Sequence, residues 1–147
     1  MMPLRFILVG LGARSRIWRR VLREHPDCRL VGLVDTDERR LVEAVGEISE
    51  MTGDSSSPVV GTTLDEVAAS VDADVALLCT PPGGRHSQVA AACSAGLSIL
   101  AEKPLADTLR DAEAHVAAAD EAGVPLVVGL NFRYLAVTEA LKGLFTD

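Results

Sequence analysis

Residues 4–15 read LRFILVGLGARS, an apolar run that leads into a turn containing two glycines. Leu4–Val9 is short and apolar, and the turn signals that follow it predict a buried strand. Ser15–His25 has the amphipathic pattern of a helix, and Pro26 ends it. A strand, a glycine turn and a helix in this order are typical of the opening unit of an α/β fold.

Working outward from this segment, short apolar runs alternate with longer amphipathic ones, which favours a parallel sheet covered by helices on both faces. Strands are predicted at residues 4–9, 29–34, 59–60, 75–79, 97–101 and 125–130. Helices are predicted at residues 15–25, 37–51, 64–70, 85–95, 108–122 and 134–145, with a serine-rich loop at 53–58. Asp107 or Thr108 is expected to cap the helix at 108–122. Right-handed crossovers make this one doubly wound Rossmann domain over residues 1–147.

Composition and charge exclude several classes of protein. The net charge is −7, whereas a duplex-binding protein needs clustered cations, so we expect no nucleic-acid partner. In the one basic cluster, Arg19, Arg20 and Arg23 are expected on a solvated helix face. The three cysteines do not have metal-ligand spacing, and we expect no metal. Free thiols favour a cytoplasmic compartment, and neither a signal peptide nor a membrane span is predicted.

The turn Gly10-Leu11-Gly12-Ala13-Arg14-Ser15 predicts a diphosphate site. Gly10 permits a tight turn, Gly12 lets the backbone approach a phosphate, and a small residue at Ser15 allows close packing of helix and strand. Amides at the helix start favour the anion. The alternative is that both glycines serve only the backbone conformation.

Asp35 ends the second predicted strand, where an acid binds the hydroxyls of a dinucleotide's ribose. This carboxylate would repel a 2′-phosphate, which favours NAD as cofactor. Arg39 and Arg40 leave NADP open, because either could reach a phosphate, although both fit a solvated helix face. Asp35 could also simply begin a turn or cap the next helix.

Polar residues also follow the later predicted strands, where ligands of open α/β sheets bind. The turn Thr80-Pro81-Pro82 could support a nicotinamide, with His86 either beside it or on the helix surface. Lys103 could hydrogen-bond a substrate and help to move its proton, held in place by the charge of Glu102. The alternative for Lys103 is an ordinary surface lysine at a strand end.

With these motifs the chain resembles the glucose–fructose oxidoreductase, inositol dehydrogenase and rhizopine-catabolism family (Gfo/Idh/MocA). The resemblance lies in the glycine turn, Val34-Asp35, Thr80-Pro81-Pro82 with His86, Asn131-Phe132-Arg133 and, above all, Glu102-Lys103-Pro104. It implies an NAD(P)-dependent enzyme that oxidises or reduces a sugar, polyol or related small molecule. It also implies roles for Gly10, Gly12, Ala13, Arg14 and Ser15 along the diphosphate and for Asp35 at the adenosine ribose. The nicotinamide would be bordered by Thr80, Pro81, Pro82 and His86. Its ribose and the substrate would be contacted by Glu102 and Lys103. The substrate would also lie near Asn131 and Arg133.

In members of this family the chain continues after the helix predicted at 134–145 for about 150–250 residues, which is the size of a second domain. That domain is an open antiparallel sheet, and it supplies most substrate contacts, an Asp/His catalytic pair and the oligomer interface. We therefore expect this chain to lack it, to bind NAD(H) and to show negligible turnover alone, with the helix at 134–145 leading into the missing domain. A homo-oligomer stays open. The alternatives are a non-catalytic NAD-binding or partner-binding module and, with no use for Glu102-Lys103-Pro104, an S-adenosylmethionine methyltransferase.

Overall fold

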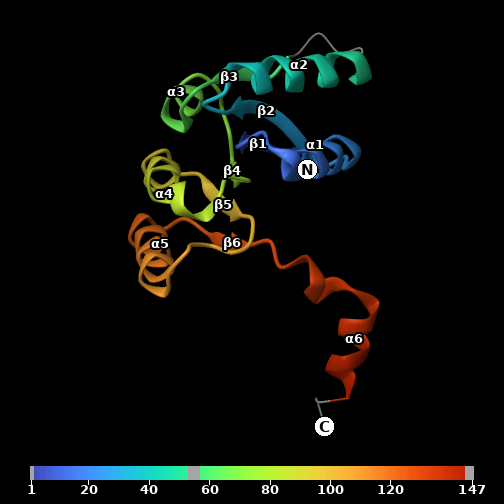
Figure 1. Cartoon of the computed structure of the whole chain (residues 1–147), viewed down its shortest axis with the longest axis vertical. Coiled ribbons are helices and arrows are strands. Elements are labelled where there is room, and N and C mark those ends of the chain that lie inside the picture. Colours follow the sequence, from blue (N-terminus) through green and yellow to red (C-terminus); the bar gives the residue numbers. More distant parts are fainter. Residues whose placement is uncertain (1, 53–56, 145–147) are drawn as a thin grey trace.

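The computed structural model describes residues 2–52 and 57–144, and its centre is a parallel sheet of six strands. The strands lie in the order β3-β2-β1-β4-β5-β6, so the order reverses between β1 and β4 (Figure 1). They are β1 (Leu4–Val9), β2 (Cys28–Val34), β3 (Val59–Gly61), β4 (Val75–Leu78), β5 (Ser98–Ala101) and β6 (Leu126–Val128). This is the order of a doubly wound Rossmann sheet, which confirms the predicted fold class.

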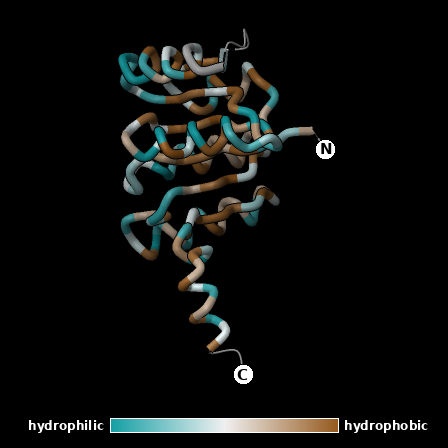
Figure 2. The backbone as a smooth tube through the Cα atoms, turned by 90° about the vertical axis from the view of Figure 1, so that its right-hand side faces the viewer, coloured by the Kyte–Doolittle hydropathy of each residue, from teal (hydrophilic) through white to brown (hydrophobic). Residues whose placement is uncertain are grey.

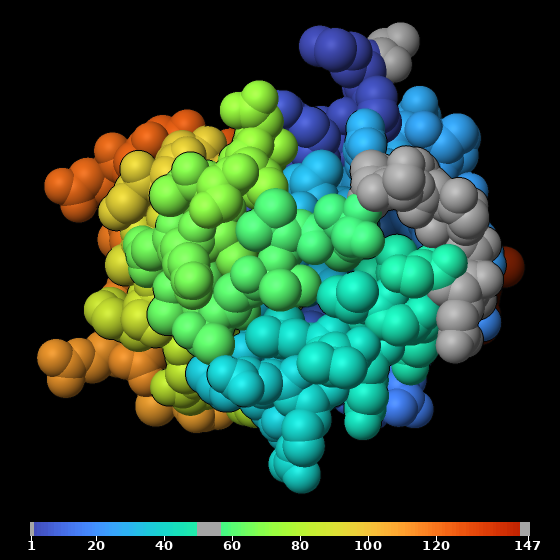
Figure 3. Space-filling model, turned by 90° about the horizontal axis from the view of Figure 1, so that it is seen from above, coloured from blue at the N-terminus to red at the C-terminus, as the bar shows by residue number. Residues whose placement is uncertain are grey.

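Helices cover the sheet on two sides (Figure 1). The helices are α1 (Ala13–Glu24), α2 (Glu38–Thr52), α3 (Leu64–Ala68), α4 (Arg85–Ser94), α5 (Leu109–Ala122) and α6 (Ala136–Gly143). Helices α1 and α2 lie on one face, and α3, α4 and α5 lie on the other. Short 3₁₀ turns precede α4 (Pro82–Gly84) and α6 (Asn131–Tyr134). Seen from above, helices α2 and α3 cover the end of the sheet at β3 (Figure 3).

Two hydrophobic cores lie on the two faces of the sheet. Ile7 and Val9 of β1 pack in the core under α3 and α4, whereas Phe6 and Leu8 pack in the core under α1 and α2. Successive side chains of a strand point to opposite faces, so a central strand covered on both faces is apolar throughout. The strands accordingly form the hydrophobic centre of the chain in Figure 2.

The element boundaries agree with the predicted ones to within a few residues. Thr108, one of the two predicted caps, accepts a hydrogen bond from the Asp111 amide at 3.1 Å. Strand β6 is shorter than predicted because a 3₁₀ turn begins at Asn131. Residues 53–56 of the predicted serine-rich loop and Phe145 of the last predicted helix lie outside the described residues.

The prediction that Arg19 lies on a solvated helix face is wrong. Helices α1 and α2 share one face of the sheet, and Arg19 is buried with its Nη2 3.0 Å from Glu47 Oε2. Arg20 and Arg23 are exposed, as expected. The periodicity of α1 cannot show that a second helix will cover part of its polar side.

Candidate functional site

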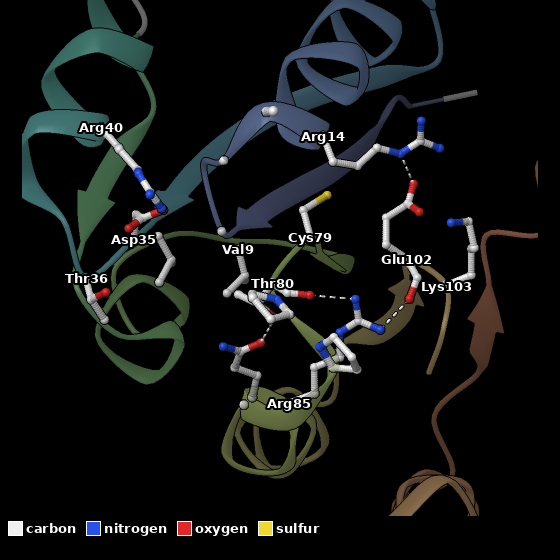
Figure 4. A pocket seen from close by; sticks show the side chains of 18 of the residues that line it. Val9, Arg14, Asp35, Thr36, Arg40, Cys79, Thr80, Arg85, Glu102 and Lys103 are labelled. Atoms are coloured by element: carbon white, nitrogen blue, oxygen red, sulfur yellow. Dashed lines mark hydrogen bonds and ion pairs between the residues drawn. The ribbon is translucent and has the colours of Figure 1, made fainter. Parts of the chain in front are cut away.

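A pocket of about 920 Å³ lies at the carboxyl ends of the strands (Figure 4). Its walls include residues at or just beyond the end of each of the six strands, so the sheet topology itself brings them together. Open α/β sheets bind ligands at this edge, where the strand order reverses. Of the predicted site residues, those lining the pocket are Gly10, Gly12, Ala13, Arg14, Asp35, Thr80, Pro81, Pro82, Glu102, Lys103 and Asn131.

The glycine turn lines the pocket and packs against Thr80, just beyond the end of β4. Gly10 has a φ of +87°, and a Cβ there would lie 2.8 Å from Thr80 Cγ2 and 2.9 Å from the Thr80 nitrogen. Gly12 is different, because a Cβ built on it meets no atom within 4 Å. It occupies the N-cap position of α1, where it has no side chain to satisfy the first-turn amides. The turn therefore presents open space and helix-start amides to the pocket.

Asp35 connects the glycine turn to the end of β2. Its Oδ2 accepts a hydrogen bond from the Leu11 amide at 2.7 Å, and its Oδ1 accepts one from the Asp37 amide at 2.9 Å. A carboxylate offers about four acceptor positions, so capacity remains for hydroxyl groups of a ligand. Asp35 is buried and lines the pocket beside the glycine turn. Asp35 therefore begins the following turn and also faces the pocket, so the structure agrees with both interpretations of this residue, as a turn residue and as a ligand-facing acid.

The two arginines that follow Asp35 lie in different places. Arg39 pairs with Asp37, its Nε 3.2 Å from Oδ1, and its side chain is exposed. Arg40 lines the pocket, with its Nη1 3.6 Å from Asp35 Oδ2. A guanidinium therefore lies beside the carboxylate that would meet the ribose, within the same pocket (Figure 4).

Beyond β4, the wall of the pocket is formed by Cys79 and the turn that follows it. Thr80 Oγ1 donates to Gln88 Oε1 at 2.6 Å, which attaches the turn to α4. Burial raises the pKa of the Cys79 thiol to about 12, and the charge of Glu102 adds to this effect. Cys79 is therefore a neutral wall residue at physiological pH rather than a nucleophile.

Glu102 is held by two residues of α1. Its Oε1 lies 2.6 Å from Arg14 Nε and accepts a hydrogen bond from Trp18 Nε1 at 2.7 Å. Burial would raise the pKa of Glu102, but the hydrogen bonds from Trp18 and Arg14 outweigh burial and lower it. Glu102 is therefore ionised at neutral pH.

The charge of Glu102 does not hold the Lys103 ammonium, which corrects the expectation from sequence. Within residues 2–52 and 57–144, the Lys103 ammonium has no ion-pair partner. Arg14 and Trp18, brought in from α1, occupy the carboxylate instead. The exposed Lys103 side chain consequently remains available at the pocket wall.

Three predicted site residues do not line the pocket. Ser15 is fully buried, and its hydroxyl donates to the Gly12 carbonyl at 2.7 Å, so it serves the packing role of the third small residue. His86 is exposed on α4, with its ring 5.7 Å from the His115 ring. Arg133 lies exposed in the 3₁₀ turn after β6, two residues beyond Asn131.

Replacing His115 with leucine is expected to stabilise the domain by about 1 kcal/mol at neutral pH, because both ring nitrogens are buried without a hydrogen-bond partner. Burial lowers the pKa of His115, with further lowering by His86 and Arg85 and an opposing effect of Asp111. The unfolded chain therefore binds a proton more readily, and wild-type stability should fall as pH drops below about 6.5. Urea denaturation at pH 7.5 and 5.5 measures both effects. The pH-dependent loss should be smaller in His115→Leu, and an equal loss in both proteins would contradict this explanation.

Sequence reasoning missed Arg85, which is the largest side chain among the fully buried described residues. It donates to the carbonyl oxygens of Thr80 and Glu102 (Figure 4). It also donates to the Pro104 carbonyl. Its only sequence signal is an arginine at the start of a helix, where the helix dipole disfavours a cation. Trp18 was also missed, because its partner lies 84 residues away.

These features define a dinucleotide-binding domain of the Rossmann type. The open space at Gly12 fits a diphosphate, and the Asp35 carboxylate lies where a ribose would follow. The pocket also has the volume of a small-molecule site.

Residues 4–130 match the oxidoreductase family with an NAD-binding Rossmann fold (Gfo/Idh/MocA), and the chain belongs to this family. It is 36% identical over 143 residues to D-apiose dehydrogenase of Paraburkholderia graminis, covering 95% of this chain and 36% of that protein. The WlbA dehydrogenase of Bordetella pertussis, solved in complex with NADH and UDP-GlcNAcA, superposes with a TM-score of 0.84 and 31% identity. GenD2 from gentamicin A biosynthesis, in complex with NAD, gives 0.86 and 30%.

The chain spans 40% of the WlbA and GenD2 chains, and these alignments cover 98% and 100% of it. The resemblance noted from the motifs is therefore confirmed, and the domain is an NAD-binding one. In the described part of the chain, every helix is too short or too polar to cross a membrane.

Proposed function

We propose that this domain binds NAD(H) for an oxidoreductase that transfers hydride between the cofactor and a sugar, polyol or related substrate. The observation that carries the proposal is the shared pocket of Gly12, Asp35 and Lys103 at the point where the strand order reverses. The names of the relatives support the substrate class, since they include D-apiose and inositol dehydrogenases. When bound, NAD supplies the nicotinamide carbon that accepts or donates the hydride.

The residues divide the work along the pocket. The amides of Gly12 and Ala13 bind the diphosphate, and Asp35 accepts hydrogen bonds from the adenosine ribose. Thr80, Pro81 and Pro82 border the nicotinamide. Glu102 contacts the nicotinamide ribose, while Arg14 and Trp18 keep its carboxylate in place. Asn131 and Arg133 are proposed to lie near the substrate, and His86 is proposed to border the nicotinamide. Of these three residues, Asn131 lines the pocket.

Lys103 is the proposed catalytic residue. In the reductive direction the Lys103 ammonium would hydrogen-bond the substrate carbonyl oxygen and give it a proton as hydride reaches the carbon. In the oxidative direction the neutral Lys103 amine would take the hydroxyl proton as hydride leaves the carbon for the nicotinamide. The ammonium has no carboxylate partner among the described residues, so a substrate oxygen meets no competing ion pair. NADP is the alternative cofactor, and Arg40 at the pocket wall is the residue that favours it.

Replacing Asp35 with asparagine is expected to weaken NADH binding about 10–100-fold, because hydrogen bonds to charged groups contribute about 1.5–3 kcal/mol. The affinity for NADPH should fall less, since the carboxylate no longer repels a 2′-phosphate. Asp65→Asn is the control, because Asp65 is exposed on α3 and is not among the lining residues. Isothermal calorimetry with both cofactors measures the difference. Unchanged NADH affinity in Asp35→Asn would remove Asp35 from the site.

The test of the proposal itself uses Trp18, the only tryptophan of the chain. Trp18 contacts Glu102 at the pocket wall, so bound NADH should quench its emission by energy transfer. Titrations with NADH, NADPH and S-adenosylmethionine separate the cofactors, and absence of saturable quenching and of heat with either nicotinamide cofactor would refute the proposal. A non-catalytic NAD-binding module would also bind NADH, and only turnover of sugars or polyols separates it from a dehydrogenase.

We also propose that residues 1–147 form one domain whose last helix leads into a further domain supplying most substrate contacts, and that the chain alone has negligible turnover. Helix α6 extends away from the sheet (Figures 1 and 2). Apolar side chains are exposed around it at Phe132, Tyr134, Val137 and Leu144. Large apolar side chains exposed along one element are typical of a contact surface. Oligomer formation would use that further domain.

A further inference from the structure

Arg85 is a buried cation at the wall of the pocket. Its side chain is 1% exposed, and it begins α4 directly after the Pro82–Gly84 turn. Nη2 donates to the Thr80 carbonyl at 2.7 Å. Nη1 donates to the Glu102 carbonyl and, at 2.6 Å, to the Pro104 carbonyl, with a longer contact of 3.4 Å to Leu105. One guanidinium therefore connects the segment after β4 with the segment after β5.

Burying this guanidinium costs free energy, which its hydrogen bonds must offset. A buried charge is disfavoured unless it is paired and hydrogen-bonded, and Arg85 forms no ion pair with any carboxylate of residues 2–52 and 57–144. Its Nε is also buried without a partner. Burial accordingly lowers the pKa of Arg85. The charges of Glu102 and Asp107 oppose this effect from a distance. The hydrogen bonds of the guanidinium, however, all go to backbone carbonyls of the two segments that border the proposed nicotinamide end.

We propose that Arg85 is a positioning residue that holds the Thr80–Pro82 turn and the Glu102–Leu105 segment in register, so that Lys103 and the proline wall face one nicotinamide. This inference rests on the proposed function. Arginine suits the task because its planar group directs several donors in fixed directions, whereas a lysine ammonium is a point charge. The adenine half of the site, at Gly12 and Asp35, is built from α1 and β2, and the Asp35 carboxylate is hydrogen-bonded by the Leu11 and Asp37 amides rather than by the segments that Arg85 connects.

A purely structural arginine would behave differently from a positioning one. Loss of a merely stabilising contact lowers the folded fraction, and so it lowers the apparent affinity for every ligand alike. Loss of register at one end of the pocket weakens only ligands that reach that end. ADP occupies the diphosphate and adenosine half, whereas NADH extends to both halves, so the ratio of their dissociation constants separates the two roles.

The experiment uses the full chain with Arg85→Met and Arg85→Lys, titrated calorimetrically with ADP and NADH. In Arg85→Met the NADH dissociation constant should rise at least about tenfold, while that of ADP stays within about twofold of the wild-type value. Arg85→Lys keeps the charge and some donors, and it should recover part of the NADH affinity. Arg19→Met is the matched control, because Arg19 is also buried with an unpartnered Nε but pairs with Glu47 away from the pocket. It should change neither constant.

Two further measurements distinguish a local change at the pocket from a general folding defect. In ligand-free Arg85→Met, amide hydrogen exchange should rise in residues 80–84 and 102–107 and stay unchanged in β1 and α1. In Arg85→Ala, millimolar guanidinium should restore NADH affinity by filling the vacated space, and equal concentrations of urea or sodium chloride should not.

The outcomes are distinguishable. A wild-type chain that binds neither NADH nor NADPH overturns the proposed function and this inference with it. A wild-type chain that binds NADH while Arg85→Met binds it equally well overturns only the role of Arg85. Equal weakening of ADP and NADH in Arg85→Met, or exchange that rises throughout the domain, assigns Arg85 to general stability and overturns the positioning role.

Discussion

Replacing Gly10 with alanine is expected to destabilise the domain by about 2–5 kcal/mol. The backbone at Gly10 has a φ of +87°, and the new Cβ would lie 2.9 Å from the Thr80 nitrogen. A left-handed conformation disfavours an L-residue by about 1–2 kcal/mol, and overpacking adds about 1–3 kcal/mol. Natural domains have only about 5–15 kcal/mol in total. Urea denaturation should show the loss, and NADH binding should fall with the folded fraction.

Gly46→Ala is the control for this change. Gly46 lies inside α2, and a Cβ there meets no atom within 4 Å. Alanine favours the helix by about 1 kcal/mol over glycine, so this variant should be more stable than wild type and should bind NADH normally. A Gly10→Ala protein that unfolds at the wild-type urea concentration would show that the close contact between the turn and β4 is absent in solution.

Replacing Gly12 with alanine is expected to leave the fold intact and to weaken NADH binding about 100-fold or more. Gly12 has a φ of −67°, which alanine adopts readily, and its Cβ would extend into open space. Because that space is where a diphosphate would contact the backbone, the methyl group would hold the phosphates away from the helix-start amides. Alanine is a poorer N-cap residue than glycine, which limits the loss of stability to about 1 kcal/mol.

Thermal denaturation and calorimetry on the same Gly12→Ala sample separate stability from binding. The expected result is a melting temperature close to that of wild type together with little or no heat on addition of NADH. Wild-type affinity in a folded Gly12→Ala protein would place the diphosphate elsewhere. Taken together, Gly10 and Gly12 should show opposite failures, one of folding and one of binding, although they are two residues apart in a single turn.

Most of the fold could be predicted because its signals are local. Phe6–Val9 is apolar throughout because both faces of β1 are covered there, and Pro26 ends the first helix wherever the helix packs. The strand-end positions of Asp35, Thr80 and Lys103 followed from the same reasoning, since parallel strands place their carboxyl ends along one edge. The burial of Arg19 was not predicted, because it depends on α2 lying beside α1.

The sequence by itself determined the parallel sheet, the glycine turn and the row of polar residues at the strand ends, because periodicity and turn chemistry act over a few neighbouring residues. Only the tertiary structure decided how that row is held. Glu102 is bound by Arg14 and Trp18 of α1 rather than by Lys103, and Arg85 is buried among strand-end carbonyls. These partners are distant in sequence, and carbonyl oxygens belong to every residue type. The pattern of side chains along the sequence therefore could not predict these contacts of Glu102 and Arg85.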